Sequence, residues 1–277
     1  MSLYKKEQHF WPLGPGKAQL EYGPISMTLE AWQGDTPLDA LLSKGAWHVA
    51  NCLVDLSTNL SKLKQPWQTY SSDEFSGLAF TLWEAVSKTK DPDLTPMAAV
   101  AGCMADMAAD FLLQEGATKV IVNNGGDIAL RLLGDERACV GISSLETGQL
   151  LKTLSLTAKD QVGGICTSGF GGRSFTLGVA EAVTVLAKTA STADAFATYL
   201  ANQTTVDAPC IKRTLAGEID PFSDIAHLAV TTQVGTLTQA EIHIALTNFS
   251  KAAEVAHFHS HIIKSYAYIK GQEKVGK

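Results

Sequence analysis

The stretch from Thr95 to Leu133 constrains the fold most, because a run of small residues is followed by a short apolar segment and a glycine turn. Alanine dominates residues 98–109, and alanine is the strongest helix former. Thr95 suits the position before a helix, Pro96 suits its first turn, and Gly116 suits the position just past its end. A helix so rich in alanine can lie very close to another backbone or to a ligand.

Two apolar segments, 119–122 and 128–133, flank the sequence NNGGD at residues 123–127, and each is typical of a strand. The turn between them can bend sharply and present oxygen atoms and bare amides. A β-hairpin connection is one interpretation, and a turn that lines a ligand site is the other. We expect the bare backbone at Gly125 and Gly126 to let a ligand or a neighbouring helix come close.

A second informative stretch, residues 165–202, begins dense in glycine and becomes helical in composition. Arg173 could pair with an anionic group there, or it could be an incidental surface residue. Asp194 and Thr198 are four residues apart, so they share a helix face. A carboxylate and a hydroxyl so placed can bind a hard cation with the help of a carbonyl. Alternatively, the Asp complements the helix dipole and the Thr bonds back to its own helix.

In chain order, three blocks of this sequence resemble the ApbE superfamily, whose named members are FAD:protein FMN transferases. The blocks are the helix carrying Asp106 together with Gly125-Gly126-Asp127, then Thr167-Ser168-Gly169, and then ADAFAT at 193–198. Together they cover roughly residues 96–202. The later segment IDPFSD, at 219–224, is similar to an uncharacterised ApbE-like family of bacterial and archaeal proteins rather than to the transferases.

The resemblance implies an α+β fold of the ApbE-like kind, with mixed sheets packed with helices. We expect one domain over residues 1–277, with the core motifs at 96–202 and a C-terminal extension at 203–277. The resemblance also implies that Asp194, Thr198 and the backbone carbonyl of Ala101 or its neighbour Val100 bind Mg²⁺. It implies a flavin nucleotide (FAD) site, and it assigns no catalytic residue. The implied flavin-site residues are Asn124, Gly125, Gly126, Asp127, Thr167, Ser168 and Gly169.

Departures from the transferase pattern leave the activity open. This chain has Ala101 where the transferases have a lysine, and Cys103 where they have an aromatic residue. It also has no histidine between Ser168 and Asp194, where the transferases carry a His-containing loop. These groups would help to bind or react with the FAD diphosphate. Three hypotheses therefore stand. The chain is a Mg²⁺-dependent enzyme for FMN transfer or FAD diphosphate hydrolysis, a noncatalytic flavin or nucleotide binding protein, or an enzyme that acts on another small metabolite at a repurposed site.

Composition excludes some classes of protein and partner. The formal net charge is −6 and no basic stripe is present, which argues against nucleic acid as a partner. Five scattered cysteines without CxxC spacing indicate neither a zinc site nor a disulfide framework, and reduced thiols are typical of the cytoplasm. The N-terminal residues lack an apolar signal core, and we expect no membrane segment. The expected partner is a small flavin or nucleotide, and a homodimer is compatible with the sequence.

The remaining pattern predicts a hairpin, further helices and further strands. The hairpin is expected over residues 16–32, the helices over 37–63 with a potential break at Gly45, 75–86 and 238–255, and the strands over 138–142, 150–157, 182–187 and 227–232. The cluster of His257, His259 and His261 could bind a transition metal. We favour a polar edge instead, because no carboxylate is clustered with the three imidazoles.

Overall fold

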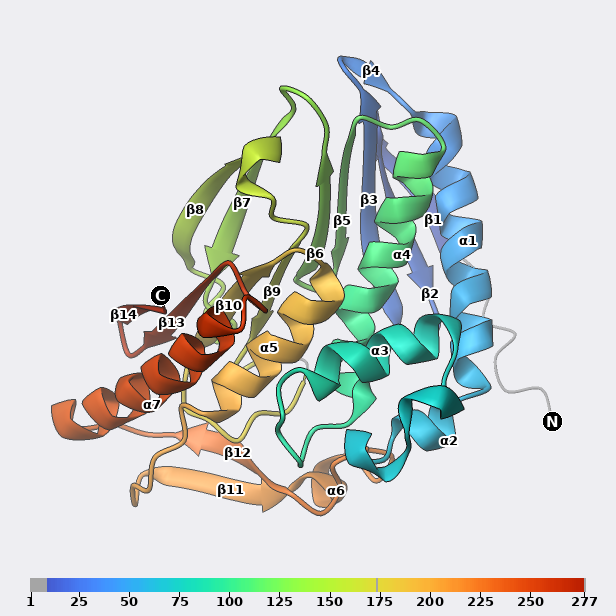
Figure 1. Ribbon diagram of the computed structural model, residues 1–277. Helices are drawn as coiled ribbons and strands as arrows, with labels where there is room; N and C mark the ends of the chain where they lie inside the picture. Colours follow the sequence, from blue (N-terminus) through green and yellow to red (C-terminus); the bar gives the residue numbers. More distant parts are fainter. Residues whose placement is uncertain (1–8, 173, 277) are drawn as a thin grey trace.

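The computed structural model describes residues 9–172 and 174–276 (Figure 1). Within these ranges, ten strands form one antiparallel sheet in the order β1-β2-β3-β5-β6-β9-β10-β13-β14, with β4 paired to β3. The strands are β1 (His9–Gly14), β2 (Lys17–Tyr22), β3 (Ile25–Gln33), β4 (Thr36–Pro37), β5 (Lys119–Asn124), β6 (Asp127–Leu132), β9 (Gly164–Ser168), β10 (Ala182–Ala187), β13 (Lys264–Ile269) and β14 (Gln272–Gly276).

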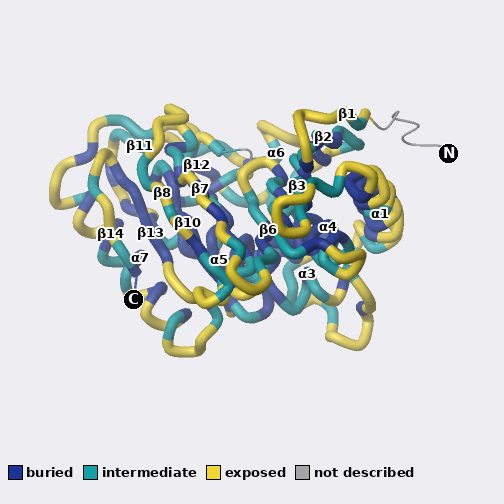
Figure 2. The backbone as a smooth tube through the Cα atoms, turned by 90° about the horizontal axis from the view of Figure 1, so that it is seen from above, coloured by how far each residue is buried: buried dark blue, intermediate teal, exposed yellow. Residues whose placement is uncertain are grey.

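Four helices cover one face of this sheet, each over a neighbouring pair of strands (Figure 1). They are α1 (Asp39–Ser57) over β2 and β3, α4 (Val100–Gln114) over β5 and β6, α5 (Ala190–Asn202) over β9 and β10, and α7 (Gln239–Phe258) over β13 and β14. A fifth helix, α3 (Gly77–Ser87), packs against α4 and α5. Figure 2 shows the buried backbone along α4 and the central strands, while α1 keeps an exposed outer face. The core therefore lies between the sheet and this helical layer.

A hairpin of β7 (Arg137–Ser143) and β8 (Leu150–Thr157) covers the other face of the sheet over β6, β9, β10 and β13. Its apolar side chains form a second, smaller cluster with those strands. A separate two-stranded ribbon joins β11 (Ile211–Leu215) to β12 (Ala229–Val234). The short helical segments are α2 (Leu60–Leu63), α6 (Ala216–Ile219), η1 (Trp67–Thr69), η2 (Ser72–Glu74), η3 (Pro96–Ala99) and η4 (Ala158–Asp160).

Several elements differ from the sequence predictions for clear physical reasons. Gly45 does not break α1, because the helix runs through it while packing against α4. A Cβ at Gly45 would lie 3.0 Å from the Leu112 side chain, so the missing side chain lets the two helices approach. The first turn at Pro96 is a 3₁₀ turn, and α4 begins at Val100. The cap at Thr238 is confirmed, with Glu241 completing a capping box.

One helical stretch, Pro96–Gln114, is long and apolar enough to cross a membrane by length and composition alone. No membrane segment was expected from the sequence, yet this stretch meets the length and composition criterion for one. Over half of this stretch (56%) is buried inside the protein, and α4 packs there against α1, α5 and the sheet. Since the core helix of a globular protein passes the same criterion, we interpret it as a core helix.

Candidate functional site

A cleft of about 490 Å³ opens at the start of α4, beside the turn between β5 and β6 and one face of α5. The predicted metal-binding residues Asp194 and Thr198 both line it, as does Ala101. Four of the predicted flavin-site residues also line it: Asn124, Gly125, Asp127 and Thr167. The fold thus brings together residues that are up to about a hundred positions apart in the sequence.

The close approach of α4 to α5 depends on Gly102. A Cβ at this position would lie 2.3 Å from the carbonyl oxygen of Ala190 and 2.8 Å from the Cβ of Asp194, so only glycine fits. The same contact serves the site, because the Gly102 amide donates a 2.9 Å hydrogen bond to Oδ2 of Asp194. The small-residue helix therefore orients the carboxylate that is expected to bind a cation.

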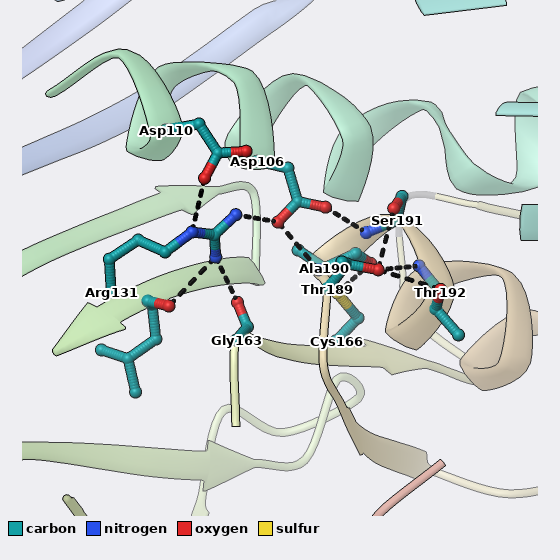
Figure 3. Close-up of polar contacts among 10 residues, drawn as sticks. Asp106, Asp110, Arg131, Gly163, Cys166, Thr189, Ala190, Ser191 and Thr192 are labelled. Atoms are coloured by element: carbon teal, nitrogen blue, oxygen red, sulfur yellow. Dashed lines mark hydrogen bonds and ion pairs between the residues drawn. The ribbon is translucent and has the colours of Figure 1, made fainter. Parts of the chain in front are cut away.

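A buried ion-pair network holds the start of α5 against α4 (Figure 3). Asp106 accepts hydrogen bonds from the backbone amides of Ala190 at 2.9 Å and Ser191 at 2.8 Å. Its Oδ1 also accepts from Nη2 of Arg131 at 2.9 Å, and Nε of Arg131 donates to Asp110 at 2.6 Å. A carboxylate at this place satisfies free helix amides and complements the helix dipole. Asp106 therefore fixes the helix that carries Asp194.

Asn124 fixes the carbonyl that was predicted as a metal ligand. Its Nδ2 donates a 3.1 Å hydrogen bond to the carbonyl oxygen of Ala101, and the Asn124 side chain is buried. This bond fixes the direction of the Ala101 carbonyl oxygen, which as part of α4 also accepts from the amide four residues on. Asn124 thus orients the Ala101 oxygen and lines the cleft beside it.

Two buried carboxyl groups dominate the electrostatics of the cleft. Burial raises the pKa of Asp127 to about 6, although the nearby Cys166 thiol and Thr167 backbone partly lower it. Burial and, next, the charge of Asp127 raise the pKa of Asp194 well above its ordinary value. Among the described residues, Oδ1 of Asp127 has no hydrogen-bond partner although it is buried. Two such groups cannot both stay charged by themselves: one must take up a proton, or a cation must lie between them.

The oxygen atoms here fit a hard divalent cation. Carboxylates of Asp194 and Asp127, the Thr198 hydroxyl and the Ala101 carbonyl all face one cleft, and oxygen-only sets suit Mg²⁺ and Mn²⁺. Sequence reasoning assigned Asp127 to the flavin site alone. Its buried, unpartnered oxygen makes it a further candidate cation ligand, and this signal appears only once the fold is known.

The NNGGD segment is a hairpin turn and also lines the cleft. Asn124 pairs with Asp127 across it, and Gly125 and Gly126 have φ values of 68° and 114°. The two interpretations from sequence are therefore compatible. No described atom lies within 4 Å of a Cβ at Gly126, so the expected approach of the Asp194 helix at that glycine is wrong. Of this segment, Asn124, Gly125 and Asp127 line the cleft, whereas Gly126 is exposed and does not.

The TSG block ends a strand and does not form a turn by itself. Thr167 and Ser168 are the last residues of β9, paired with β10. The Thr167 hydroxyl shares a 2.8 Å hydrogen bond with that of Thr184, while the buried Ser168 hydroxyl has no partner among the described residues. A Cβ at Gly169 would lie 2.8 Å from the carbonyl oxygen of Ala180, so this glycine permits a close backbone contact.

The segment 220–225 forms the outer wall of the cleft. Nζ of Lys64 donates a 2.6 Å hydrogen bond to the carbonyl of Phe222, and the Thr95 hydroxyl donates to Asp224. The Phe222 side chain lines the mouth and is 80% exposed. Five aspartates line the cleft in total: Asp93, Asp127, Asp194, Asp220 and Asp224. Lys64 is the only lysine or arginine among the described lining residues, and Arg173 lies outside the part of the chain that the structure describes.

The histidine cluster lies away from this cleft. His257 belongs to the last turn of α7, the helix ends at Phe258, and the chain reverses at Ser260 with a φ of 56°. His259 and His261 stack on each other and line a different cavity. Across residues 9–172 and 174–276, no group of three or more His, Cys, Asp or Glu side chains is placed to hold a metal ion. The three imidazoles therefore do not form the transition-metal site that was considered.

An antiparallel sheet with helices on one face, a hairpin on the other and an oxygen-lined cleft at α4 and α5 defines an α+β protein of the ApbE-like kind. A family model described as "AbpE bacteria" matches residues 9–275. The chain belongs to this family.

Relatives and solved structures agree with this assignment. A UPF0280 protein of Methanobrevibacter smithii is 42% identical over 115 residues, 40% of this chain and 47% of the relative. A UPF0280 protein of Methanopyrus kandleri is 35% identical over 148 residues, 52% and 59% of the two chains. The chain thus spans about half the length of the curated relatives it matches.

Two flavin transferases share the fold across almost the whole chain. The flavin transferase ApbE of Vibrio cholerae has a TM-score of 0.53 at 13% identity, and the match covers 98% of this chain and 97% of the transferase. The Pseudomonas stutzeri flavinyl transferase ApbE, in its apo form, has a TM-score of 0.50 at 14% identity, with 100% and 97% covered. At these identities the likeness establishes the fold.

Proposed function

We propose that the chain binds a flavin dinucleotide together with Mg²⁺ or Mn²⁺ in the cleft, and that it breaks the diphosphate bond of this ligand. The observation that carries the proposal is the buried pair of Asp127 and Asp194 beside the Ala101 carbonyl, with one carboxylate oxygen lacking a partner. The fold shared with two flavin transferases supports the choice of a flavin nucleotide as ligand.

Charge makes a cation necessary for this ligand. A diphosphate would enter a cleft lined by five aspartates and, among the described residues, one lysine. Like charges within a few Å repel by about 4 kcal/mol per pair at an effective dielectric constant of 20. A bound divalent cation would supply charge neutralisation at the phosphate oxygens as the bond breaks. The chain itself holds the ligand oxygens: Gly102 orients Asp194, and Asn124 orients the Ala101 carbonyl.

Phe222 is the residue that we assign to the flat ring of the ligand. Its side chain is 80% exposed at the mouth of the cleft, and its backbone is held on both sides. Lys64 donates to its carbonyl, and its own amide donates to Asp220 at 2.9 Å. An exposed aromatic ring on a fixed backbone can stack on an isoalloxazine or adenine ring with little loss of conformational entropy.

The reaction follows from the ligand chemistry. A new P–O bond forms between an acceptor oxygen and the FMN phosphorus, the P–O bond to AMP breaks, and the acceptor loses its proton. With water as the acceptor, the products are FMN and AMP; with a protein hydroxyl, FMN becomes attached to that protein. The lysine that transferases carry is Ala101 here, so we expect hydrolysis or weak transfer rather than efficient flavin attachment.

The test combines thermal melting with product analysis. Mg²⁺ and Mn²⁺ should raise the melting temperature of the metal-free protein, because a ligand that binds only the folded state stabilises it. Asp194→Asn should abolish this shift and Thr198→Val should reduce it, whereas the matched control Asp110→Asn should keep it. An equal shift in wild type and Asp194→Asn would refute the proposed cation site.

Mass spectrometry of the reaction mixture then separates the hypotheses. Release of FMN and AMP from FAD only with the divalent cation present supports the enzyme. Cation-dependent FAD binding without product would instead identify a noncatalytic flavin-binding protein. Absence of FAD binding, with the cation response intact, would indicate another metabolite at the same cation site.

A further inference from the structure

A second cavity, of about 750 Å³, lies on the other side of α5 from the cation site. Asp194 and Thr198 face the cleft, while Phe196 and Tyr199 on the same helix face this cavity. Its other walls are the 88–93 loop after α3, the C-terminal end of α7, and Arg213 and Ala229 of the β11–β12 ribbon. The volume lies within the range of ligand pockets, about 300–1,000 Å³.

Aromatic rings form one side of the cavity. His261 packs on Phe196 with ring centroids 5.5 Å apart and an interplanar angle of 32°. His259 stacks on His261 at 5.7 Å and 28°, and Tyr199 meets Phe196 edge to face at 6.1 Å. Phe196 itself is buried, so the accessible ring surface for a flat ligand comes from His259, His261 and Tyr199.

The positive charges that line the cavity are only partly neutralised. Nζ of Lys88 pairs with Glu84 at 3.4 Å, but Nζ of Lys90 lies 5.5 Å from the centre of the Trp67 ring. Arg213 donates to two neutral oxygens, the Thr205 hydroxyl at 3.0 Å and the Val206 carbonyl at 3.2 Å. These contacts leave the charges of Lys90 and Arg213 available to an anion.

Two acidic side chains, Asp91 and Asp93, also line the cavity. Burial and then the charge of Asp91 raise the pKa of the Tyr199 phenol. Asp93 lines both the cavity and the cleft, so it marks the boundary between them. The pKa of His261 is lowered by burial and then by His259, Lys88 and Lys90. The cavity therefore combines cationic side chains near His261 with Asp91 as a hydrogen-bond acceptor.

We propose that this cavity binds a phosphorylated compound with a flat ring, of the size of a nucleoside monophosphate. Lys90 holds the phosphate beside His261, and the ring packs against the Tyr199 side of the cavity. Asp91 accepts hydrogen bonds from donors at the far end of the ligand. The compound could be the AMP released in the neighbouring cleft or a separate metabolite, and the shared chemistry is a monophosphate ester on a ringed body. The site does not depend on the proposed function of the cleft.

Calorimetric titration of 5′-AMP into the full chain, with EDTA present, tests the proposal. Wild type should bind, and Lys90→Gln and His261→Gln should each weaken binding about tenfold or more. Lys251→Gln is the matched control, because Lys251 is exposed on α7 and does not line the cavity. Asp194→Asn should leave this binding unchanged, which separates the second site from the cation site. Melting curves of each variant establish that it is folded.

Two further arms define the ligand. Binding of AMP should raise the pKa of His261, read from the Cε1 proton shift by NMR, because a bound phosphate favours the imidazolium. Flavin mononucleotide and inorganic phosphate are titrated in parallel. The reaction proposed for the cleft would release both AMP and FMN, so the tighter-binding nucleotide identifies which of these two products the cavity fits better. Any one of four results would overturn the proposal. They are no AMP or FMN binding in EDTA, equal binding to His261→Gln and wild type, loss of binding with Asp194→Asn, and inorganic phosphate binding as tight as either nucleotide.

Discussion

Replacing Asp106 by asparagine should destabilise the protein far more than the same replacement one turn later at Asp110. Both carboxylates pair with Arg131, but the Asp106 side chain is 8% exposed and that of Asp110 is 46% exposed. Asp106 also accepts the amides of Ala190 and Ser191, whereas Asp110 accepts only from Arg131 among the described residues. Because both carboxylates share Arg131, comparing the two substitutions measures what burial and the capping of the α5 amides add to stability.

The magnitude follows from the bonds that are lost. Asparagine keeps one acceptor oxygen and presents an NH₂ group to donors, so at least one of three donors is left unpaired. A hydrogen bond to a charged group contributes about 1.5–3 kcal/mol, and breaking a buried ion pair costs about 3–5 kcal/mol. We expect Asp106→Asn to lower the free energy of unfolding by about 3 kcal/mol. Asp110→Asn breaks a half-exposed pair and should cost about 0–1 kcal/mol.

Urea unfolding at pH 7, with EDTA present, measures both values if the two variants keep the wild-type denaturant slope. Asp106→Asn should also weaken the Mg²⁺ response, because the start of α5 is no longer fixed and Asp194 follows it. Losses that differ by less than about 0.5 kcal/mol between the two variants would refute the reasoning. In that case Asp106 would not fix α5 through its buried bonds.

Three shorter predictions follow from the same structure. Gly126→Ala should cost about 1–2 kcal/mol of stability, because φ is 114° there. The variant should keep the Mg²⁺ melting shift, since Gly126 does not line the cleft. A lost melting shift at normal stability would contradict this prediction. Between pH 4 and pH 6, metal-free wild type should lose stability as the pH rises, because folding raises the pKa of Asp127 to about 6 and the native state then binds more protons than the unfolded state. Asp127→Asn should remove this contribution, as read from urea midpoints. An unchanged dependence of the urea midpoint on pH in Asp127→Asn would contradict the prediction. Phe222→Ala should weaken FAD binding about 5- to 10-fold, measured by flavin fluorescence, without changing stability, since the ring is 80% exposed. Phe222→Tyr should restore FAD binding. Equal FAD binding by the Ala and Tyr variants would exclude stacking.

Local patterns predicted much of the fold. The hairpin of β2 and β3, the strands β5 to β8, and the helices α4, α5 and α7 all follow from apolar spacing, caps and glycine positions near their predicted places. Such signals act over a few residues, so the sequence contains them directly. β13 and β14 were not predicted, because β13 is buried by pairing with β10, and β14 is added to the sheet by pairing with β13, rather than through their own alternation.

The site was predictable only in part. Asp194 and Thr198 share a helix face by their spacing, and the structure places both in the cleft. Arg131 could not be assigned, because its partner Asp106 lies 25 residues away on another element. The role of Gly102 in helix packing could not be predicted either, since it depends on how closely α5 approaches α4. Long-range contacts of this kind leave no local pattern in a single sequence.

Alanine rather than lysine at position 101 changes the electrostatics of the cleft but leaves the proposed cation ligands in place. A lysine at this position would add a positive charge to a wall that already holds Asp127 and Asp194. With alanine there, Lys64 is the only described cation on the lining, and its ammonium group bonds the Phe222 carbonyl. The backbone oxygen of Ala101 is independent of the side chain, and Asn124 still orients it. Since no cation among the described lining residues pairs with the two carboxyls, we expect a proton or a divalent ion to neutralise them and a divalent ion to accompany an anionic ligand.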